Sequence, residues 1–314
     1  MASRATYPDL KGKTFVVTGA ASGMGRTLSL QLAAQGAKLG LLDLRAPDAT
    51  AAEISQLGAE SLALACNVQD ASAVDAAFKA VVDRFGRLDG AANMAGIVGN
   101  QKLGETKYAI DALVDSDWDN MLATNLNGVK NCLRAEFRLM SGNAGGSIIN
   151  AASISGQLGH PFASPYNVSK WGVIGLTKCA AQEVGGKRIR VNAVAPLVTL
   201  FLPLPFLIFN EGTPETDRLK LICRFDRGII DTPLTQSLGS KEVLQQYLGS
   251  HIALGRFAGP EEVTKVLVFL LSDEASYITG SVSLSISSLN RSPFLENSNK
   301  LTVKQVVNID GGWS

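Results

Sequence analysis

The feature that most constrains this chain is a glycine-rich turn between a short apolar run and a helical pattern. The run Lys13–Thr18 is apolar and β-branched, which predicts a buried strand. The turn follows it, and the pattern Arg26–Gln35, closed by Gly36, predicts a helix. A strand, a glycine turn and a helix in this order allow backbone N–H groups and a helix N-terminus to bind a phosphate. The candidate phosphate-binding residues are Gly19, Ser22, Gly23, Met24 and Gly25.

The next apolar run, Lys38–Leu42, predicts a second strand that ends at Asp43. A carboxylate in this place accepts hydrogen bonds from the ribose hydroxyls of an adenine dinucleotide and repels a 2′-phosphate. We therefore expect NAD(H) as the preferred cofactor and NADP(H) as the less favoured one. Arg45 is a nearby cation that could weaken this preference. The alternative interpretation of Asp43 is a helix cap or a solvated loop residue.

Strand and helix patterns alternate through the first two thirds of the chain. Such alternation is typical of right-handed βαβ units and predicts an α/β fold with a parallel sheet. Further helices are predicted over Glu53–Leu57, Ala71–Phe85, Asp117–Met140 and Pro165–Val184, and further strands over Ser61–Cys66, Leu88–Ala92, Ser147–Ala151 and Arg188–Val194.

Tyr166 and Lys170 are four residues apart, which places them one turn apart on one face of the last predicted helix. An ammonium beside a phenol stabilises the phenolate, so we expect Lys170 to lower the pKa of Tyr166 towards the range of a general acid/base. Ser153 follows a buried strand and could point its hydroxyl into the crevice where parallel sheets bind ligands. The alternative is a chance spacing on an ordinary helix. The buried side of this helix is predicted to consist of Val168, Trp171, Val173, Ile174 and Leu176.

Composition limits the classes of protein that fit. The 314 residues are 46% hydrophobic and carry a net charge of +1, which suits a large core and not a polybasic nucleic-acid binder. No apolar window reaches the roughly 18 residues of a membrane span, and the first residues lack the apolar core of a secretory signal. The four cysteines form no Cys-x-x-Cys pair, and only two histidines are present. We expect a cytoplasmic protein with reduced thiols, no metal, and neither a nucleic-acid nor a membrane partner.

With these residues assembled, the chain resembles the short-chain dehydrogenase/reductase family. The resemblance covers most of residues 10–281 and the tail Val306–Trp313. It implies a three-layer, doubly wound Rossmann fold with a mostly seven-stranded parallel sheet, a nicotinamide cofactor, a small-molecule substrate and a homodimer or homotetramer. The motifs that carry it are Thr18-Gly-Ala-Ala-Ser-Gly-Met-Gly25, Asp43, Asn93-Met-Ala-Gly96, Asn125, Ser153, Tyr166-x-x-x-Lys170 and a split Pro196…Gly228 with Thr232.

The resemblance also implies a catalytic tetrad of Asn125, Ser153, Tyr166 and Lys170. Ser153 would bind the substrate oxygen, Tyr166 would pass the proton, and Lys170 would hold the cofactor ribose. Asn125 would anchor a water next to Lys170, although it could instead be a helix-kink residue bonded to backbone. Asn67 stands where the family usually has Asp, and Met94 replaces a second Asn. The cofactor-binding residues implied beyond the glycine turn are Asp43, Asn67, Val68, Asn93, Ala95, Gly96, Tyr166, Lys170, Pro196, Gly228, Ile230 and Thr232.

Two segments, 197–227 and 282–305, interrupt the family pattern within what we expect to be one Rossmann-type domain spanning 1–314. Without them, Pro196 would lead straight to Gly228, and Ser281 to the last strand beginning at Val306. One hypothesis is that both are translated introns. The competing hypothesis is a genuine lid or disordered loop, since long loops in compact domains are usually functional or disordered.

Two functions follow from these residues. The first is an NAD(H)-dependent oxidoreductase that interconverts a secondary alcohol and its ketone by hydride transfer, with Tyr166 as general acid/base. The second is a catalytically silent nucleotide-binding or scaffold protein whose site is blocked by the two insertions. The sequence identifies neither the substrate nor the physiological direction.

Overall fold

The computed structural model describes residues 6–100, 105–140, 145–196, 230–239 and 257–283. Within these ranges, a parallel sheet has seven strands in the order β3-β2-β1-β4-β5-β6-β7. The chain runs outward from β1 in one direction and then, from β4, in the other, so the predicted doubly wound α/β fold is confirmed. The strands are β1 (Thr14–Thr18), β2 (Lys38–Asp43), β3 (Ser61–Ala65), β4 (Gly90–Asn93), β5 (Gly146–Ala151), β6 (Ile189–Val194) and β7 (Val282–Ser283).

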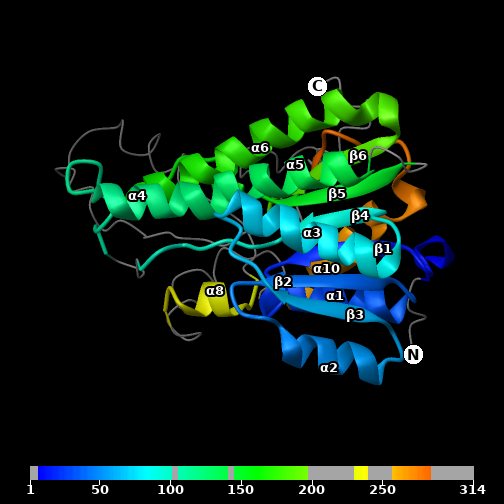
Figure 1. Ribbon diagram of the computed structural model, residues 1–314. Helices are drawn as coiled ribbons and strands as arrows, with labels where there is room; N and C mark the ends of the chain where they lie inside the picture. Colours follow the sequence, from blue (N-terminus) through cyan, green and yellow to red (C-terminus); the bar gives the residue numbers. More distant parts are fainter. Residues whose placement is uncertain (1–5, 101–104, 141–144, 197–229, 240–256, 284–314) are drawn as a thin grey trace, which may run out of the picture.

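Helices cover both faces of the sheet. Figure 1 shows α1, α2 and α10 on one side and α3, α5 and α6 on the other, which gives the three predicted layers. Every residue of β1 is buried, as expected for a central strand of a sheet that is covered twice. The described helices are α1 (Gly23–Ala34), α2 (Asp48–Gln56), α3 (Ala71–Phe85), α4 (Asp115–Leu122), α5 (Gly128–Met140), α6 (Ser164–Val184), α8 (Pro233–Gln236) and α10 (Pro260–Leu271).

The crevice that this topology creates lies where the strand order reverses, at the carboxyl ends of β1 and β4. In doubly wound sheets ligands bind at this switch point because the two crossing connections leave in opposite directions. The glycine turn follows β1, and Asn93-Met-Ala-Gly96 begins within β4. The fold therefore brings both predicted cofactor segments to one edge of the sheet.

The predicted helix Asp117–Met140 is interrupted. The chain forms α4, then a π-helical turn over Ala123–Asn127, then α5. Asn125 lies at the middle of this turn and is fully buried. Apolar periodicity missed the interruption because the apolar residues continue on both sides of it, whereas a π turn depends on contacts made elsewhere.

The predicted buried side of α6 is partly wrong. Val173 is fully buried, but Val168 is 42% exposed and Trp171 is 52% exposed. The inward face of this helix is instead mixed, and its buried polar side chains include Tyr166, Ser169, Lys170 and Thr177. Apolar character alone could not identify this face, because its polar side chains are satisfied by partners within the core.

The edge strand β7 differs from the predicted last strand. Val282 and Ser283 pair in parallel with Ala193 and Val194 of β6, although both residues were assigned to the second insertion. Val282, like the predicted first strand residue Val306, is a valine, and it takes an edge-strand position before the rest of that segment begins. The tail Val306–Trp313 and nearly all of both predicted insertions lie outside the described residues.

Candidate active site

The glycine turn is shaped by close backbone approaches. Gly19 has φ +67°, and a Cβ there would lie 3.0 Å from the backbone nitrogen of Ala95. A Cβ on Gly25 would lie 2.1 Å from the carbonyl oxygen of Gly19, so any larger residue would push α1 away from the turn. The first turn of α1 begins at Gly23, with Ser22 as the preceding N-cap and Met24 half-buried beside it. This cradle of backbone N–H groups at a helix N-terminus fits the pyrophosphate of a dinucleotide.

Asp43 lies at the end of β2 and faces this turn. Its carboxylate accepts hydrogen bonds from the backbone nitrogens of Ala21 (2.9 Å) and Leu44 (2.7 Å). The negative charge is thus fixed next to the residues that would hold the adenosine half of a dinucleotide. Arg26, in the first turn of α1, forms an ion pair with Glu53 of α2. Arg26, the cationic residue directly after the glycine turn, is therefore already paired with a carboxylate.

The predicted adenine-side residues follow β3. Asn67 is exposed, and its side-chain oxygen accepts a hydrogen bond from the backbone nitrogen of Gln69. Val68 is buried against α5, where a Cβ on Gly128 would lie 2.7 Å from it. The backbone nitrogen of Cys66 bonds to the carbonyl oxygen of Asp43, which fixes this segment beside the end of β2.

The segment after β4 is tied to the glycine turn through Thr18. Its hydroxyl accepts hydrogen bonds from the backbone nitrogens of Met94 (3.0 Å) and Ala95 (3.1 Å). Asn93 is buried within β4. A Cβ on Gly96 would lie 3.2 Å from Oδ1 of Asn125 and 3.5 Å from Nζ of Lys170. Gly96 therefore sits where two predicted catalytic side chains meet.

Asn125 is held by backbone on both ends of its amide. Oδ1 accepts from the backbone nitrogen of Ile97, and Nδ2 donates to the carbonyl oxygen of Ile97, both at 2.8 Å. Nδ2 also lies 3.2 Å from the hydroxyl oxygen of Ser169. Asn125 lies in an irregular helical turn bonded to backbone, as the alternative interpretation expects, and it approaches Gly96 from the same side as Lys170. Its role as the anchor of a water stays a prediction.

Ser153, Tyr166 and Lys170 come together above the end of β5. All three are buried, and a side-chain hydrogen bond joins Ser153 to Tyr166. Nζ of Lys170 lies 5.6 Å from the centre of the Tyr166 ring and donates a 2.7 Å hydrogen bond to the carbonyl oxygen of Ala151. The Ser153 hydroxyl also accepts from the backbone nitrogen of Ser155, as the cap of a short 3₁₀ turn.

The expected lowering of the Tyr166 pKa is wrong for this structure. Burial raises the pKa of Tyr166 to about 12, against a smaller opposing effect of the hydrogen bond with Ser153. Burial also lowers the pKa of Lys170 to about 8. Desolvation wins in both cases because each group is enclosed by protein and the lysine gives its hydrogen bond to a carbonyl, not to the phenol.

The nicotinamide-side residues are described in part. Thr232 is buried and caps α8 by accepting from the backbone nitrogen of Thr235. A Cβ on Gly23 would lie 3.7 Å from Thr232, so this segment returns to the glycine turn. Pro196 accepts from the backbone nitrogen of Ile154, and Ile230 forms a bridge with Ala258. Gly228, the remaining predicted residue, lies outside the described residues.

The sequence model of the short chain dehydrogenases matches residues 13–200. The chain belongs to the short-chain dehydrogenase/reductase family. A second family model, described as enoyl-(acyl carrier protein) reductase, matches residues 218–285. As a member of this family the protein is an oxidoreductase that binds NAD(H) or NADP(H).

Named short-chain dehydrogenase/reductase relatives align over most of the chain. The 3-oxoacyl-(acyl-carrier-protein) reductase FabG of Thermotoga maritima is 35% identical over 275 residues, covering 87% of this chain and 96% of the relative. The short-chain dehydrogenase/reductase aba4 of Botryotinia fuckeliana is 34% identical over 278 residues, covering 85% and 93%. The solved structure of levodione reductase has a TM-score of 0.70 at 30% identity, covering 88% of this chain and 96% of that one. A putative short-chain alcohol dehydrogenase from Sinorhizobium meliloti gives 0.73 at 30% identity, with the same coverage.

Sequence reasoning missed three polar residues beneath the short-chain dehydrogenase/reductase site, namely Glu136, Asn150 and Thr177. Asn93 Nδ2 donates to Asn150 Oδ1 (2.9 Å), and Asn150 Nδ2 donates to the hydroxyl of Thr177 (3.0 Å). Glu136 of α5 is fully buried beside them. An asparagine inside the apolar run Ser147–Ala151 was the available signal, because a buried strand carries an amide only where that amide has partners.

Among the described helices, none is long and apolar enough to cross a bilayer.

Proposed function

We propose that this protein interconverts a secondary alcohol and its ketone with NAD(H), and that Tyr166 is the general acid/base. The observation that carries the proposal is the meeting of Ser153, Tyr166 and Lys170 at the carboxyl end of β5. The glycine turn lies at the same edge of the sheet, connected to them through Gly96 and Thr18. A phenol, a hydroxyl and an ammonium beside a dinucleotide cradle suit proton transfer coupled to hydride transfer.

A bound nicotinamide cofactor supplies the hydride for ketone reduction or takes it up in alcohol oxidation. Ser153 orients the substrate by donating a hydrogen bond to its oxygen. Tyr166 is protonated at neutral pH, since its pKa is raised to about 12, and this is the form that donates a proton to a ketone oxygen. Lys170 binds the ribose hydroxyls of the cofactor, and Asn125 holds the backbone at Ile97 next to it. The phenol and the ammonium are both shielded from bulk water, which strengthens their interaction with the reacting oxygen.

The preference for NAD(H) rests on charge near the glycine turn. The Asp43 carboxylate is fixed by the backbone of Ala21 and would repel a 2′-phosphate on the adjoining ribose. Arg26 is paired with Glu53, so it offers a 2′-phosphate less attraction than a free guanidinium would. Arg45 is exposed two residues beyond Asp43 and is the competing influence.

An apolar cluster next to Tyr166 supports a substrate with an apolar group beside its carbonyl. The phenol ring packs with side chains from several separate segments, including the loop after β4 and α8. Burial of apolar surface would then contribute to binding, while Ser153 and Tyr166 fix the oxygen. The cluster consists of Val98, Tyr108, Met121, Ala163, Tyr166 and Leu238, with Ile97, Leu113 and Leu234 packed against it.

A cofactor-by-substrate screen of the full chain tests this function. It would measure NADH and NADPH oxidation with a panel of apolar ketones, and NAD⁺ reduction with the matching alcohols. We expect turnover with NADH, and Tyr166→Phe should lower kcat by about 10²–10⁴-fold while NADH still binds. The silent nucleotide-binding alternative gives NADH binding without turnover on every substrate. Failure of NADH to bind would contradict both.

We also propose a cytoplasmic homodimer or homotetramer. The exposed apolar residues Val168 and Trp171 on α6 support a subunit contact on the outer side of this helix, because contiguous apolar surface of this kind favours association. Light scattering of the purified protein and of Trp171→Glu tests it. A wild-type chain that is monomeric at micromolar concentration contradicts the proposal.

A further inference from the structure

Glu136 is a completely buried acidic residue that the proposed reaction does not use. It lies on α5 with 0% exposure, and neither of its carboxyl oxygens has a hydrogen-bond partner among the described residues. Oδ1 of Asn93 is buried and unpartnered in the same region. Three acceptor oxygens without a donor would be costly in a core, since each unpaired buried polar group costs about 1–3 kcal/mol. A proton on the carboxyl would remove this conflict.

The hydrogen bonds of Thr177 on α6 determine which group donates and which accepts in the series of side chains Thr177, Asn150 and Asn93. The hydroxyl of Thr177 donates to the carbonyl oxygen of Val173 (2.7 Å), so its oxygen is left to accept from Asn150. Oδ1 of Asn150 in turn accepts from Nδ2 of Asn93. Oδ1 of Asn93 is therefore the acceptor at the end of this series, and it still needs a donor.

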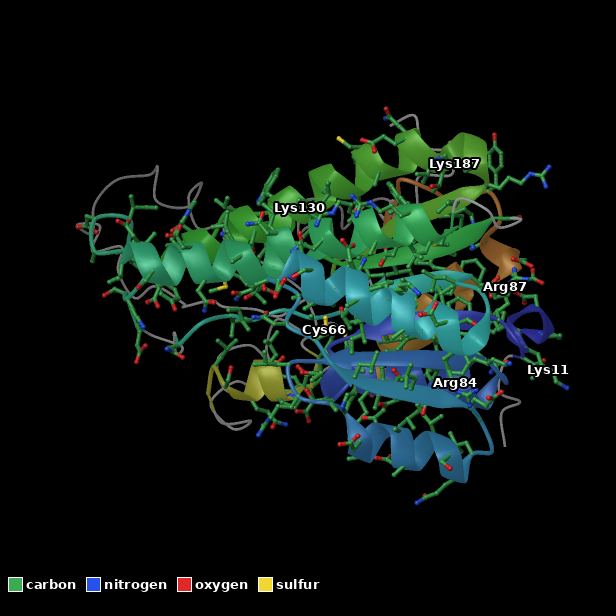
Figure 2. All side chains as sticks on the ribbon, in the orientation of Figure 1. Lys11, Cys66, Arg84, Arg87, Lys130 and Lys187 are labelled. Carbon is green, nitrogen blue, oxygen red and sulfur yellow. The ribbon has the colours of Figure 1, made fainter. Side chains whose placement is uncertain are left out.

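Among the described residues, no positively charged group acts on the Glu136 carboxyl to balance an ionised form. Cys132 of α5 is the titratable group that interacts with it in the core, and Cys132 in turn interacts with Cys66, which follows β3. The packed strands β4 and β5 carry no titratable side chain. Burial raises the pKa of Glu136 to about 8, while the Asn93 amide acts to lower it. Figure 2 shows Cys66 towards the middle of the molecule, in contrast to Lys130 on the outside of α5.

The other charged residues of α5 and those of the helices packed against it are exposed, half-buried or bonded to other groups. On α5 itself, Lys130 and Arg138 are exposed, Arg138 pairs with Asp75, and Arg134 is half-buried. On α6, the Lys170 ammonium is bonded to the carbonyl oxygen of Ala151. The remaining charged residues of the packed helices, exposed or half-buried, are Lys79, Asp83 and Arg84 on α3 and Lys178 and Glu183 on α6.

We propose that Glu136 is a neutral carboxylic acid that pairs with the amide of Asn93 and so positions α6 for the reaction. The acid O–H donates to Oδ1 of Asn93, and the second hydrogen on Nδ2 points to the other carboxyl oxygen. Each of the four linked side chains, Glu136, Asn93, Asn150 and Thr177, then has hydrogen-bond partners. Glu136 acts through Asn93, Asn150 and Thr177, so it is a positioning residue and not a catalytic one.

The series of hydrogen bonds from Glu136 to Thr177 ends where α6, the helix that carries Tyr166 and Lys170, is attached to the sheet. Thr177 is two helical turns beyond Lys170 on α6, and Asn150 directly precedes Ala151, whose carbonyl oxygen holds Lys170. The asparagine side chain and the neighbouring carbonyl thus bind the same helix at two places. This role for α6 rests on the proposed function, but the protonation of Glu136 does not.

Infrared spectroscopy and two variants of the full-length protein test the proposal. At pH 7 we expect the wild type to show the C=O stretch of one protonated carboxylic acid, and Glu136→Gln to lose it. The glutamine has the shape and hydrogen-bonding capacity of the neutral acid, so kcat and KM should stay at wild-type values. Glu136→Ala leaves Asn93 unpaired. It should lower kcat, and it should lower the melting temperature by roughly 5 °C or more.

The pH profile of thermal unfolding gives a readout that a merely space-filling role would not change. Between the ordinary glutamate pKa of 4.5 and about 8, the unfolded chain is ionised at this position and the folded protein is not. Wild-type stability at this group is thus full below 4.5 and is lost as pH rises to about 8. The melting temperature of Glu136→Gln should rise relative to wild type by roughly 5 °C or more from pH 5 to pH 8.

Three results would overturn the proposal. One is a wild-type spectrum at pH 7 without an acid band that Glu136→Gln removes. Another is a melting-temperature difference between Glu136→Gln and wild type that is flat with pH. The third is a Glu136→Gln variant as damaged as Glu136→Ala. If Glu136→Ala fails to fold, the infrared band and the glutamine profile still decide, and loss of turnover in the wild type would contradict only the proposed function.

Discussion

Nζ of Lys170 lies 5.6 Å from the centre of the Tyr166 ring, yet its hydrogen bond goes to the main-chain oxygen of Ala151. The ammonium is therefore buried beside the phenol without bonding to it. Burial makes the charged form of the lysine less stable than it is in water, and the carbonyl offsets this only in part, since the pKa is still lowered to about 8. The site thus holds a group whose charge state changes close to physiological pH.

This titration predicts how stability depends on pH. Between about 8 and the ordinary lysine pKa of 10.5, the unfolded chain binds one more proton than the folded protein at this position. The free energy of unfolding of the wild type should rise with pH across this window, by on the order of 3 kcal/mol from this group. Lys170→Met lacks the effect. Thermal unfolding of both proteins from pH 7 to 10.5, without cofactor, should show wild type gaining on the variant, and parallel curves would contradict the burial of this charge.

Asn125 provides a second test, through its two hydrogen bonds to Ile97. Asn125→Ala leaves a part-buried N–H and a part-buried carbonyl of Ile97 without their 2.8 Å partners, each loss costing up to about 1–3 kcal/mol. We expect lower thermal stability and a lower kcat, because the loop after β4 also carries Gly96. Asn127→Ala is the matched control, since Asn127 is an exposed asparagine in the same π turn. Equal effects of the two substitutions would show that the Ile97 contacts do not matter.

The features of the fold and the site that could be predicted are those set by residues close together in the sequence. The glycine turn, β1 and α3 were predicted almost to the residue because propensity, periodicity and capping agree there. Asp70, for example, caps α3 by accepting from the backbone nitrogens of Ser72 and Ala73. Tyr166 and Lys170 were placed on one helix face by spacing alone, and the structure brings Ser153 to them.

The features that were missed depend on contacts between distant segments. The π turn at Asn125 is tied to Ile97, and the polar inward face of α6 depends on Asn150 and Ala151. The sign of the Tyr166 pKa shift was wrong because it is set by how completely the folded protein encloses the phenol. A pattern of residues along the chain does not contain that quantity.

Cofactor preference is tested by removing one charge. Asp43→Asn keeps an acceptor for the backbone nitrogen of Ala21 and deletes the carboxylate that would repel a 2′-phosphate. We expect the ratio of kcat/KM for NADPH to that for NADH to rise by about tenfold or more, since 1.4 kcal/mol corresponds to a factor of ten. Asp48→Asn is the control, because Asp48 is an exposed carboxylate at the start of α2. A wild type that already prefers NADPH would reject the assignment of Asp43.

We propose that the segments 197–227 and 282–305 are insertions into a single Rossmann-type domain. The family matches cover 13–200 and 218–285 and so leave out most of both segments. Pro196 contacts the loop after β5, and Thr232 lies against the glycine turn, so residues on both sides of the first segment already belong to the site. The described part of the site is thus formed by residues outside this segment.

A variant that lacks 197–227 and 282–305 should therefore fold and should turn over at least as fast as the full chain. Its joins, Pro196 to Gly228 and Ser281 to Val306, again place a valine directly after Ser281, where Val282 pairs with Ala193 of β6. Loop closure costs little per added residue, so the full chain is also expected to fold, and the larger difference should appear in kcat/KM. Sequencing of the transcript separates the two origins: messages without both segments identify translated introns. A transcript that contains both, together with a shortened chain that is inactive while the full chain turns over, would instead identify a functional lid.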